Sequence, residues 1–187
     1  MLQVQLGILR DIKDAEIDLM RVWRNEPATR VNMYTQHEIS TNEHATWWAK
    51  TRIKENDKYF MYEIDGIPAG ISAFTGIDHH SETSAWAFYA SPTAPRGTGS
   101  KMEYLMLQYA FEKLKLQKLY CEVLAFNASV IKLHQKFGFK IEGIFRNQYK
   151  APTGFVDIYR LGILSSEWQE IHPIMHAKLA ELQKTKI

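Results

Sequence analysis

Residues 84–110 read SAWAFYASPTAPRGTGSKMEYLMLQYA, and this stretch decides the fold. Its first seven residues are small, apolar or aromatic, a composition typical of a β-strand. Two glycines, Gly97 and Gly99, follow in a loop that contains two prolines. After the loop, Met102, Leu105 and Tyr109 recur at intervals of three and four, which predicts an amphipathic helix. The stretch therefore predicts a strand, a glycine loop and a helix in succession.

The loop RGTGSK, residues 96–101, has the composition of an anion-binding turn. The first N–H groups of a helix have no partner inside the helix and lie at the positive end of its dipole, so they attract a phosphate. The order of residues fits neither a Walker loop nor a dinucleotide-binding loop, whose third glycine position is occupied by Met102. The loop thus predicts a phosphate-containing ligand of another class, although two glycines that only turn the chain into a helix would give the same pattern.

The segments on either side alternate between strand and helix patterns. Strands are expected over 1–10, 58–64, 67–75, 84–90, 118–124, 139–149 and 155–164. Helices are expected from Asp14 to before Pro27, from a cap at Thr41 or Asn42 to near Asn56, after the glycine loop, over 128–136 and over 165–187, with a loop over 27–40. This pattern predicts one α/β domain over 1–187, a mixed central sheet of about seven strands flanked by helices on both faces.

Length and composition bound the class of protein. The chain has 187 residues, 45% hydrophobic and 24% charged, which fits one globular domain and excludes a disordered chain. A net charge of +2 and a pI near 8.5 are too small to predict a nucleic-acid partner. The sequence contains neither the roughly 20-residue apolar run of a membrane span nor a recognisable secretory signal. Because Cys121 is the one cysteine, no internal disulfide can form, and a cytoplasmic protein is expected.

The order of these motifs resembles the GNAT acetyltransferase superfamily. The resemblance rests on the glycine loop after a strand, on Asn127 at the start of a short helix, and on the sequence KFGF, residues 136–139, that ends this helix. It implies a GNAT fold and acetyl coenzyme A as cosubstrate, without a metal. Ala94 stands where the family commonly has Gln or Arg, and we expect Arg96 to replace that charge. The residues implied to bind the coenzyme are Gly97, Thr98, Gly99 and Ser100 at the pyrophosphate, and Asn127 and the main chain of Phe88, Tyr89 and Ala90 at the pantetheine arm.

A second set of residues carries a narrower resemblance: WRNEP at 23–27, Met33, Tyr34, His44, Trp47 and KYF at 58–60. Together they resemble one branch of this family. The branch acetylates the 4-amino group of a UDP-linked 4-amino-4,6-dideoxy sugar in pseudaminic acid biosynthesis, a pathway of flagellin glycosylation. An Arg among aromatic residues suits a nucleotide sugar, because its guanidinium can pair with the diphosphate. The resemblance implies a nucleotide-sugar partner, no nucleic acid and no membrane, and allows a homodimer. The residues implied to bind the acceptor are Arg24, Met33, Tyr34, His44 and Trp47.

Two other functions remain open from the sequence. A ribosomal-protein N-terminal (alanine) acetyltransferase also carries a Trp and Arg cluster after its first strand. A non-catalytic module that binds acyl coenzyme A without turnover would share the same fold. An assay of coenzyme A release with UDP-amino sugars and N-terminal peptides side by side would separate these functions.

Two side chains are candidates for catalysis by direct attack of the amine on the thioester. Glu122, on the strand after the coenzyme helix, is expected to bind the amine or to deprotonate it through water, although a structural ion pair explains it as well. His134 lies seven residues after Asn127, where the family commonly has a tyrosine that protonates the leaving thiolate. With the ordinary pKa of a histidine, about 6.5, this acid would lose its proton in the neutral range. An ordinary packed histidine is the alternative.

Other reactive side chains are expected to be structural. Cys121 is interpreted as a small buried hydrophobic residue. His172 and His176 have a metal-like spacing, but Pro173 intervenes and no Glu follows His172, so both are expected to face solvent and no metal site is expected.

Overall fold

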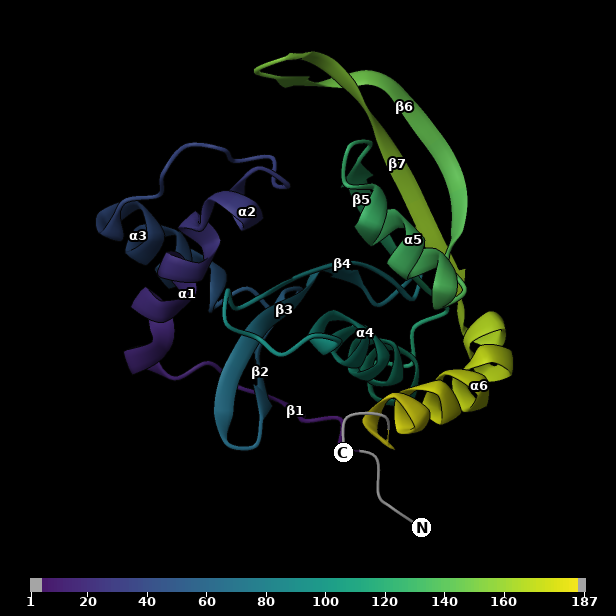
Figure 1. Cartoon of the computed structure of the whole chain (residues 1–187). Coiled ribbons are helices and arrows are strands. Elements are labelled where there is room, and N and C mark those ends of the chain that lie inside the picture. Colours follow the sequence, from purple (N-terminus) through teal and green to yellow (C-terminus); the bar gives the residue numbers. More distant parts are fainter. Residues whose placement is uncertain (1–4, 185–187) are drawn as a thin grey trace.

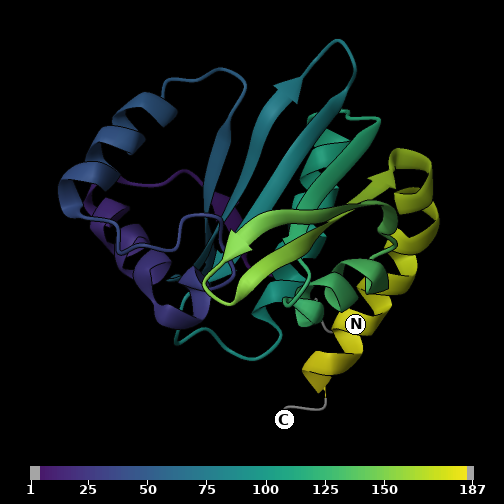
Figure 2. The same cartoon turned by 90° about the horizontal axis from the view of Figure 1, so that it is seen from above.

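The computed structural model describes residues 5–184 as a mixed seven-stranded sheet with helices on both faces (Figures 1 and 2). The strand order across the sheet is β1-β2-β3-β4-β5-β7-β6, and only β4 and β5 pair in parallel. The strands are β1 Ile8–Arg10, β2 Lys58–Ile64, β3 Ile67–Asp78, β4 Thr83–Ala90, β5 Lys118–Leu124, β6 Lys140–Ala151 and β7 Gly154–Leu164. The helices are α1 Ile17–Asn25, α2 Pro27–Arg30, α3 Thr41–Thr51, α4 Thr98–Gln108, α5 Ala128–Lys136 and α6 Ser165–Lys184.

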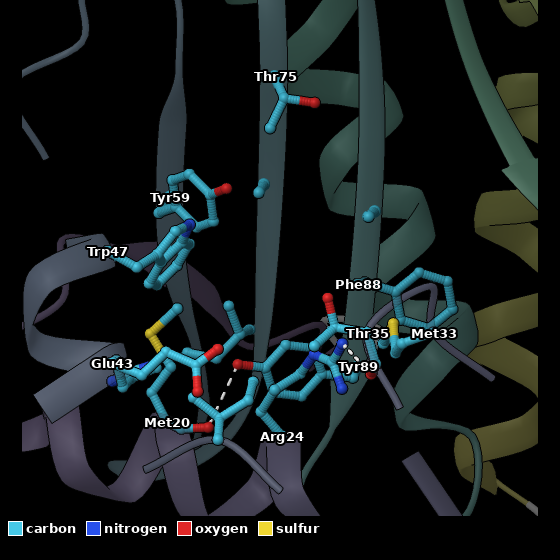
Figure 3. A pocket seen from close by; sticks show the side chains of 15 residues that line it. Met20, Arg24, Met33, Thr35, Glu43, Trp47, Tyr59, Thr75, Phe88 and Tyr89 are labelled. Carbon is cyan, nitrogen blue, oxygen red and sulfur yellow. Dashed lines mark hydrogen bonds between the residues drawn. The ribbon is translucent and has the colours of Figure 1, made fainter. Parts of the chain in front are cut away.

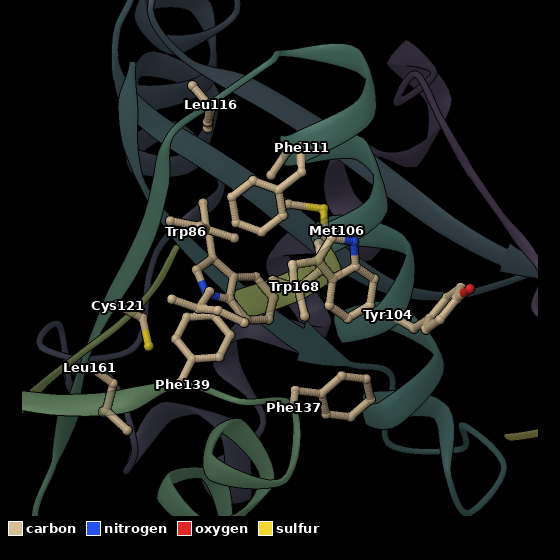
Figure 4. Packing of buried hydrophobic residues seen from close by; sticks show 14 of the residues in the cluster. Trp86, Tyr104, Met106, Phe111, Leu116, Cys121, Phe137, Phe139, Leu161 and Trp168 are labelled. Carbon is tan, nitrogen blue, oxygen red and sulfur yellow. The ribbon is translucent and has the colours of Figure 1, made fainter. Parts of the chain in front are cut away.

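The alternation of side chains along the strands divides the core between the two faces. In β2, Phe60 packs into the large cluster formed with α4 and α6, whereas its neighbour Met61 packs against α1 and α3 on the other face. Figure 4 shows the centre of the large cluster, where Trp86, Cys121 and Phe139 lie close together. One face of the sheet is therefore covered by α4, α5 and α6, and the other face by α1 and α3.

Strands β4 and β5 separate after a short parallel pairing. Their register runs only from Thr83 opposite Lys118 to Ala85 opposite Tyr120. Beyond this point β4 continues to pair with β3 on its other side, as far as Ala90 opposite Gly70. The edge of β4 that faces β5 is thus open over its last residues, and this opening positions the candidate site.

The fold confirms the α/β class, the seven strands and the helices on both faces. Strands β2 and β5 and helix α5 have the predicted bounds, and Gly138 ends α5 with a φ of 93°. Cys121 is buried, as predicted, and the adjacent tryptophans differ, with Trp48 buried and Trp47 37% exposed.

Several predicted boundaries are wrong. Helix α3 is capped by Ser40, whose hydroxyl accepts a hydrogen bond from the Glu43 N–H, instead of by Thr41 or Asn42, and it ends at Thr51 instead of near Asn56. The segment expected as a loop over 27–40 begins with α2, because Pro27 at the first helical position starts a new helix. Strand β1 is confined to Ile8–Arg10, and residues 1–4 and 185–187 of the predicted terminal elements lie outside the described residues.

Candidate active site

The glycine loop starts helix α4 as the sequence predicts. Gly97 is the cap of the helix and has a φ of 93°, in the left-handed region that favours glycine. Thr98 is tied back to Pro95, whose carbonyl accepts both its N–H and its hydroxyl. The next amides, of Gly99 and Ser100, belong to the helical turn whose N–H groups lack intrahelical partners. A Cβ at Gly99 would stand 3.4 Å from the Phe88 ring, so the loop lies against β4. This geometry suits a pyrophosphate.

A groove lies where β4 and β5 separate, and we call it the β4–β5 groove. Its volume is about 240 Å³. The open edge of β4 forms one side, the helix-capping residue Asn127 lies at the start of α5, and both catalytic candidates line it. The sequence-predicted residues in its lining are Phe88, Tyr89, Ala90, Glu122, Asn127, His134 and Met33. An extended chain with amide groups, such as pantetheine, can pair with the unpaired backbone of β4 as an added strand would.

His134 lies on α5 against a buried carboxylate from another helix. Its Nδ1 forms a hydrogen bond with Oε1 of Glu103, on α4, across 2.8 Å, and the two side chains are 3% and 0% exposed. The other carboxylate oxygen of Glu103 has no hydrogen-bond partner among the described residues. Desolvation alone would lower the pKa of His134, but Glu103 and Cys121 outweigh it and raise the pKa to about 10. The contact with Glu103 therefore favours a protonated His134 at neutral pH, which the sequence did not predict because its pattern does not reveal the buried carboxylate.

A second cavity, the α1–α3 cavity, lies on the other face of the sheet and has a volume of about 300 Å³. Four of the five predicted acceptor-binding residues line it: Arg24, Met33, His44 and Trp47. In Figure 3, Trp47 and Tyr59 lie next to each other on one wall, with their ring centroids 5.5 Å apart in an edge-on arrangement. Met33, Phe88 and Tyr89 line both this cavity and the β4–β5 groove, so the two spaces adjoin at β4.

Arg24 is the cation of the α1–α3 cavity, and no carboxylate pairs with it among the described residues. Its Nη2 donates to the carbonyl of Thr35 across 3.1 Å, a contact drawn in Figure 3, whereas its Nη1 is buried without a partner. Burial lowers the pKa of Arg24, but a guanidinium remains charged at neutral pH. A buried, unpaired N–H of a cation is costly unless a ligand satisfies it.

His44 and Glu43 complete the cavity wall on α3. His44 is buried, and desolvation lowers its pKa, so the imidazole is neutral and can donate or accept a hydrogen bond. Glu43 is bound to His37, with Oε1 2.8 Å from Nε2. One oxygen of this lining carboxylate is thus bound to a partner outside the cavity.

Tyr34, the fifth predicted acceptor residue, lies apart from the other four. Its hydroxyl donates to Oε2 of Glu122 across 2.9 Å, and its carbonyl accepts from the hydroxyl of Tyr149 on β6 across 3.1 Å. Arg160 on β7 donates to the other oxygen of Glu122 across 3.0 Å. These bonds tie the segment after α2 to the β6–β7 hairpin, which arches toward it in Figure 1. Glu122 is therefore an ion-paired carboxylate that also lines the β4–β5 groove.

The sequence did not single out three residues that the structure brings to the site. Glu103 does not stand out in the amphipathic pattern of α4. Its position one helical turn after the glycine loop is the sequence feature that could have identified it. Arg160 lies directly opposite Glu122 in the pairing of β5 with β7, which no local motif reveals. Tyr149 comes from the far end of the hairpin.

His172 and His176 have the spacing of metal ligands, and the structure explains His172 differently from the predicted solvent exposure. His172 does not face solvent, because its Nε2 lies 2.6 Å from the hydroxyl of Tyr104 and its ring stacks on the Tyr104 ring, which joins α6 to α4. The expectation for His172 is wrong, while His176 is exposed as predicted. Within residues 5–184, no three His, Cys, Asp or Glu side chains cluster as metal ligands, and no helix is both long and apolar enough to span a membrane.

Comparison with known proteins places this geometry in a family. The family described as an acetyltransferase (GNAT) domain matches residues 9–157. Two proteins named Acetyltransferase PseH, from strains of Campylobacter jejuni, are 29% and 30% identical over 138 residues, which span 74% of this chain and 85% of theirs. Spermidine N(1)-acetyltransferase of Escherichia coli K12 is 25% identical over 63% of this chain and 64% of its own length.

A solved structure shares the fold at a lower identity. The spermidine N-acetyltransferase of Vibrio cholerae, in complex with CoA and spermine, superposes with a TM-score of 0.81 over 87% of this chain and 97% of that chain, at 19% identity. Its likeness supports the fold alone. Since the family match spans most of the sequence and the relatives that cover it are named acetyltransferases, the chain belongs to the GNAT acetyltransferase family and is an acetyltransferase.

Proposed function

We propose that this acetyltransferase transfers the acetyl group of acetyl coenzyme A to the 4-amino group of a UDP-linked 4-amino-4,6-dideoxy sugar, a reaction of pseudaminic acid biosynthesis. The relatives named PseH support this acceptor, and so does the chemistry of the α1–α3 cavity. The coenzyme would occupy the glycine loop and the β4–β5 groove, and the nucleotide sugar would enter from the α1–α3 cavity.

The observation that carries the proposal is the unpartnered Nη1 of Arg24. A diphosphate supplies oxygen acceptors for a guanidinium and compensates its buried charge. The aromatic walls at Trp47 and Tyr59 offer surfaces on which a uracil or sugar ring can stack. Both features match a nucleotide sugar.

A polyamine, the acceptor named for the spermidine acetyltransferases, fits the same cavity less well. Its positive charges would approach Arg24, and the lining carboxylate of Glu43 is already bound to His37. A ribosomal N-terminal peptide would be held mainly through its backbone and does not require a buried cation. Relatives named acetyltransferases give the non-catalytic alternative no support.

The proposed chemistry is direct attack in a ternary complex. Glu122 would bind the acceptor ammonium or accept its proton through water, and the backbone of β4 near Tyr89 and Ala90 would donate a hydrogen bond to the thioester carbonyl. The amine forms its bond to the acetyl carbon as the carbon–sulfur bond breaks. His134 would transfer a proton from Nε2 to the departing thiolate. Glu122 and His134 extend from different elements, β5 and α5, to the same groove.

A panel of acceptors tests the proposal. Coenzyme A release would be measured with the UDP-linked amino sugar, the same sugar without UDP, spermidine, and alanine-initiated ribosomal peptides. We expect the largest kcat/KM with the UDP-linked sugar. A preference for spermidine or for the peptides would refute the acceptor assignment, and coenzyme binding without turnover on any of them would favour the non-catalytic module.

A further inference from the structure

The Glu103–His134 pair joins the two helices that flank the coenzyme site. Glu103 lies on α4, five residues after the start of this helix at Thr98, and His134 lies on α5, near its C-terminal end. Both side chains are buried, and the 2.8 Å contact uses Nδ1 of the imidazole. A carboxylate at this distance from a ring nitrogen fixes the tautomer and the orientation of the ring. With Nδ1 engaged by Glu103, Nε2 is the nitrogen left to meet the β4–β5 groove, which Cys121, a second hydrogen-bond partner of His134, also lines.

The surroundings of His134 explain why a charged partner strongly affects the protonation of its imidazole. Aromatic rings of Trp86, Phe88 and Phe139 pack around the imidazole, with centroids 5.2 to 6.1 Å away. The titratable side chains that act on it are Glu103 from α4 and Cys121 from β5. In an apolar enclosure a charge is stable only when an opposite charge is in direct contact. Glu103 supplies that opposite charge across 2.8 Å, and Cys121 adds to its effect.

We propose that Glu103 is a positioning residue, which keeps His134 protonated and holds its Nε2–H toward the β4–β5 groove. The inference rests on the proposed role of His134 as the general acid. In the transfer step the Nε2–H bond breaks, the proton joins the thiolate of coenzyme A, and the imidazole becomes neutral while Nδ1–H remains on Glu103. Solvent returns a proton to Nε2 after the products leave.

The direction of the pKa shifts agrees with this geometry. The carboxylate contact raises the pKa of His134 to about 10, the ordinary value of a tyrosine, although burial alone would lower it. Burial raises the pKa of Glu103, and the His134 charge opposes that rise. Glu103 thus gives a histidine the acidity of the tyrosine that the family commonly has at this position.

An NMR titration of histidine ring nitrogens tests the inference without any acceptor. Labelled wild-type protein and its E103Q variant would be compared, with the His134 signal identified by its loss in H134Q. We expect a charged imidazole at pH 7.5 in the wild type and a neutral one in E103Q. E112Q, which changes an exposed glutamate just beyond α4, is the matched control and should leave His134 charged. A neutral His134 in the wild type, or a charged one in E103Q, would overturn the inference.

Two further variants allow the titration to be interpreted if E103Q folds poorly. E103D retains a carboxylate and should restore part of the charge on His134, whereas C121S removes the thiol and should leave His134 charged. A His134 that stays neutral in E103D would contradict the role of the carboxylate, and loss of the charge in C121S would assign that role to Cys121.

Kinetics then separate a positioning role from a purely structural one. In E103Q we expect kcat to fall by about tenfold or more at pH 7.5 and to recover toward acid pH, with the KM for acetyl coenzyme A nearly unchanged. A parallel loss at every pH would indicate damage to the fold and contradict the inference. The titration does not depend on the acceptor, so a wrong acceptor assignment leaves its result intact. Full turnover in H134F would instead refute the general acid of the proposed function.

Discussion

The two halves of the proposed active site, one for the coenzyme and one for the acceptor, are built in different ways. The coenzyme half consists of main chain: a glycine loop at the start of α4 and the edge of β4 that opens where β5 turns away. The acceptor half consists of side chains from α1, α3 and β2, around the α1–α3 cavity. A cosubstrate shared by a family can be held by backbone groups, which vary little with sequence. Recognition of one acceptor depends on individual side chains such as Arg24, and this is where substitutions should change specificity.

The largest effect is expected at His134, in the β4–β5 groove. H134F removes the proton donor but keeps a ring in the aromatic enclosure, so turnover should fall by about 10²-fold or more while the coenzyme dissociation constant changes little. In the wild type, turnover should stay level through neutral pH and decline as the pH approaches 10, because the protonated form is the active one. Pre-steady-state measurement of thiol release across pH checks both expectations. Wild-type turnover in H134F would make His134 a packing residue.

A change in the acceptor half should alter one substrate only. R24K keeps the charge but loses the planar fork of donors, so the KM for the UDP-linked sugar should rise by about tenfold, with coenzyme affinity unchanged. R52K is a matched control. Arg52 lies at the end of α3, is exposed and forms an ion pair with Asp14. Steady-state kinetics with both substrates would reveal the difference. Equal activity of the wild type on the free and UDP-linked sugars would contradict the role of Arg24.

A substitution in the coenzyme half should instead weaken the binding of the coenzyme. G97A forces a side chain into the left-handed region, at a cost of about 1 kcal/mol, and we expect the coenzyme dissociation constant to rise about fivefold. G99V adds bulk beside Phe88, and it should also weaken the coenzyme severalfold by blocking the approach of the pyrophosphate. G66A at the β2–β3 turn is a control with a similar φ of 76°. Calorimetric affinities equal to the wild type in both loop variants would remove the loop from the site.

The smallest effect is expected at Tyr34, in the segment after α2 that contacts the β6–β7 hairpin. Y34F deletes the hydrogen bond from the tyrosine hydroxyl to Glu122, which Arg160 still holds. The KM for the acceptor should rise about two- to threefold, because one exposed hydrogen bond is worth roughly 0.5 kcal/mol or slightly more. Y120F, on the same strand as Glu122, serves as the control. An unchanged KM would show that this contact does not support the acceptor site.

The same contrast explains what the sequence could predict. The glycine loop, Asn127 and the strand patterns are local signals, and they predicted the fold and the segments that border the β4–β5 groove, which we propose holds the coenzyme. The positions of Arg24, His44 and Trp47 in one cavity followed from the family resemblance alone, since Arg24 comes from α1 whereas His44 and Trp47 come from α3. Glu103 and Arg160 were missed because their partners, His134 and Glu122, lie 31 and 38 residues away in sequence. Contacts across the sheet or between helices leave no periodic pattern in the chain.

The position of the acetyl group in the product tests the central claim most directly. The enzyme would be incubated with acetyl coenzyme A and the UDP-linked 4-amino-4,6-dideoxy sugar, and the product would be analysed by two-dimensional NMR and mass spectrometry. We expect one added acetyl group, in amide linkage to the nitrogen at carbon 4, with the UDP group intact and the yield sharply reduced in R24K. No acetylated sugar under conditions in which spermidine or an N-terminal peptide is acetylated would contradict the account.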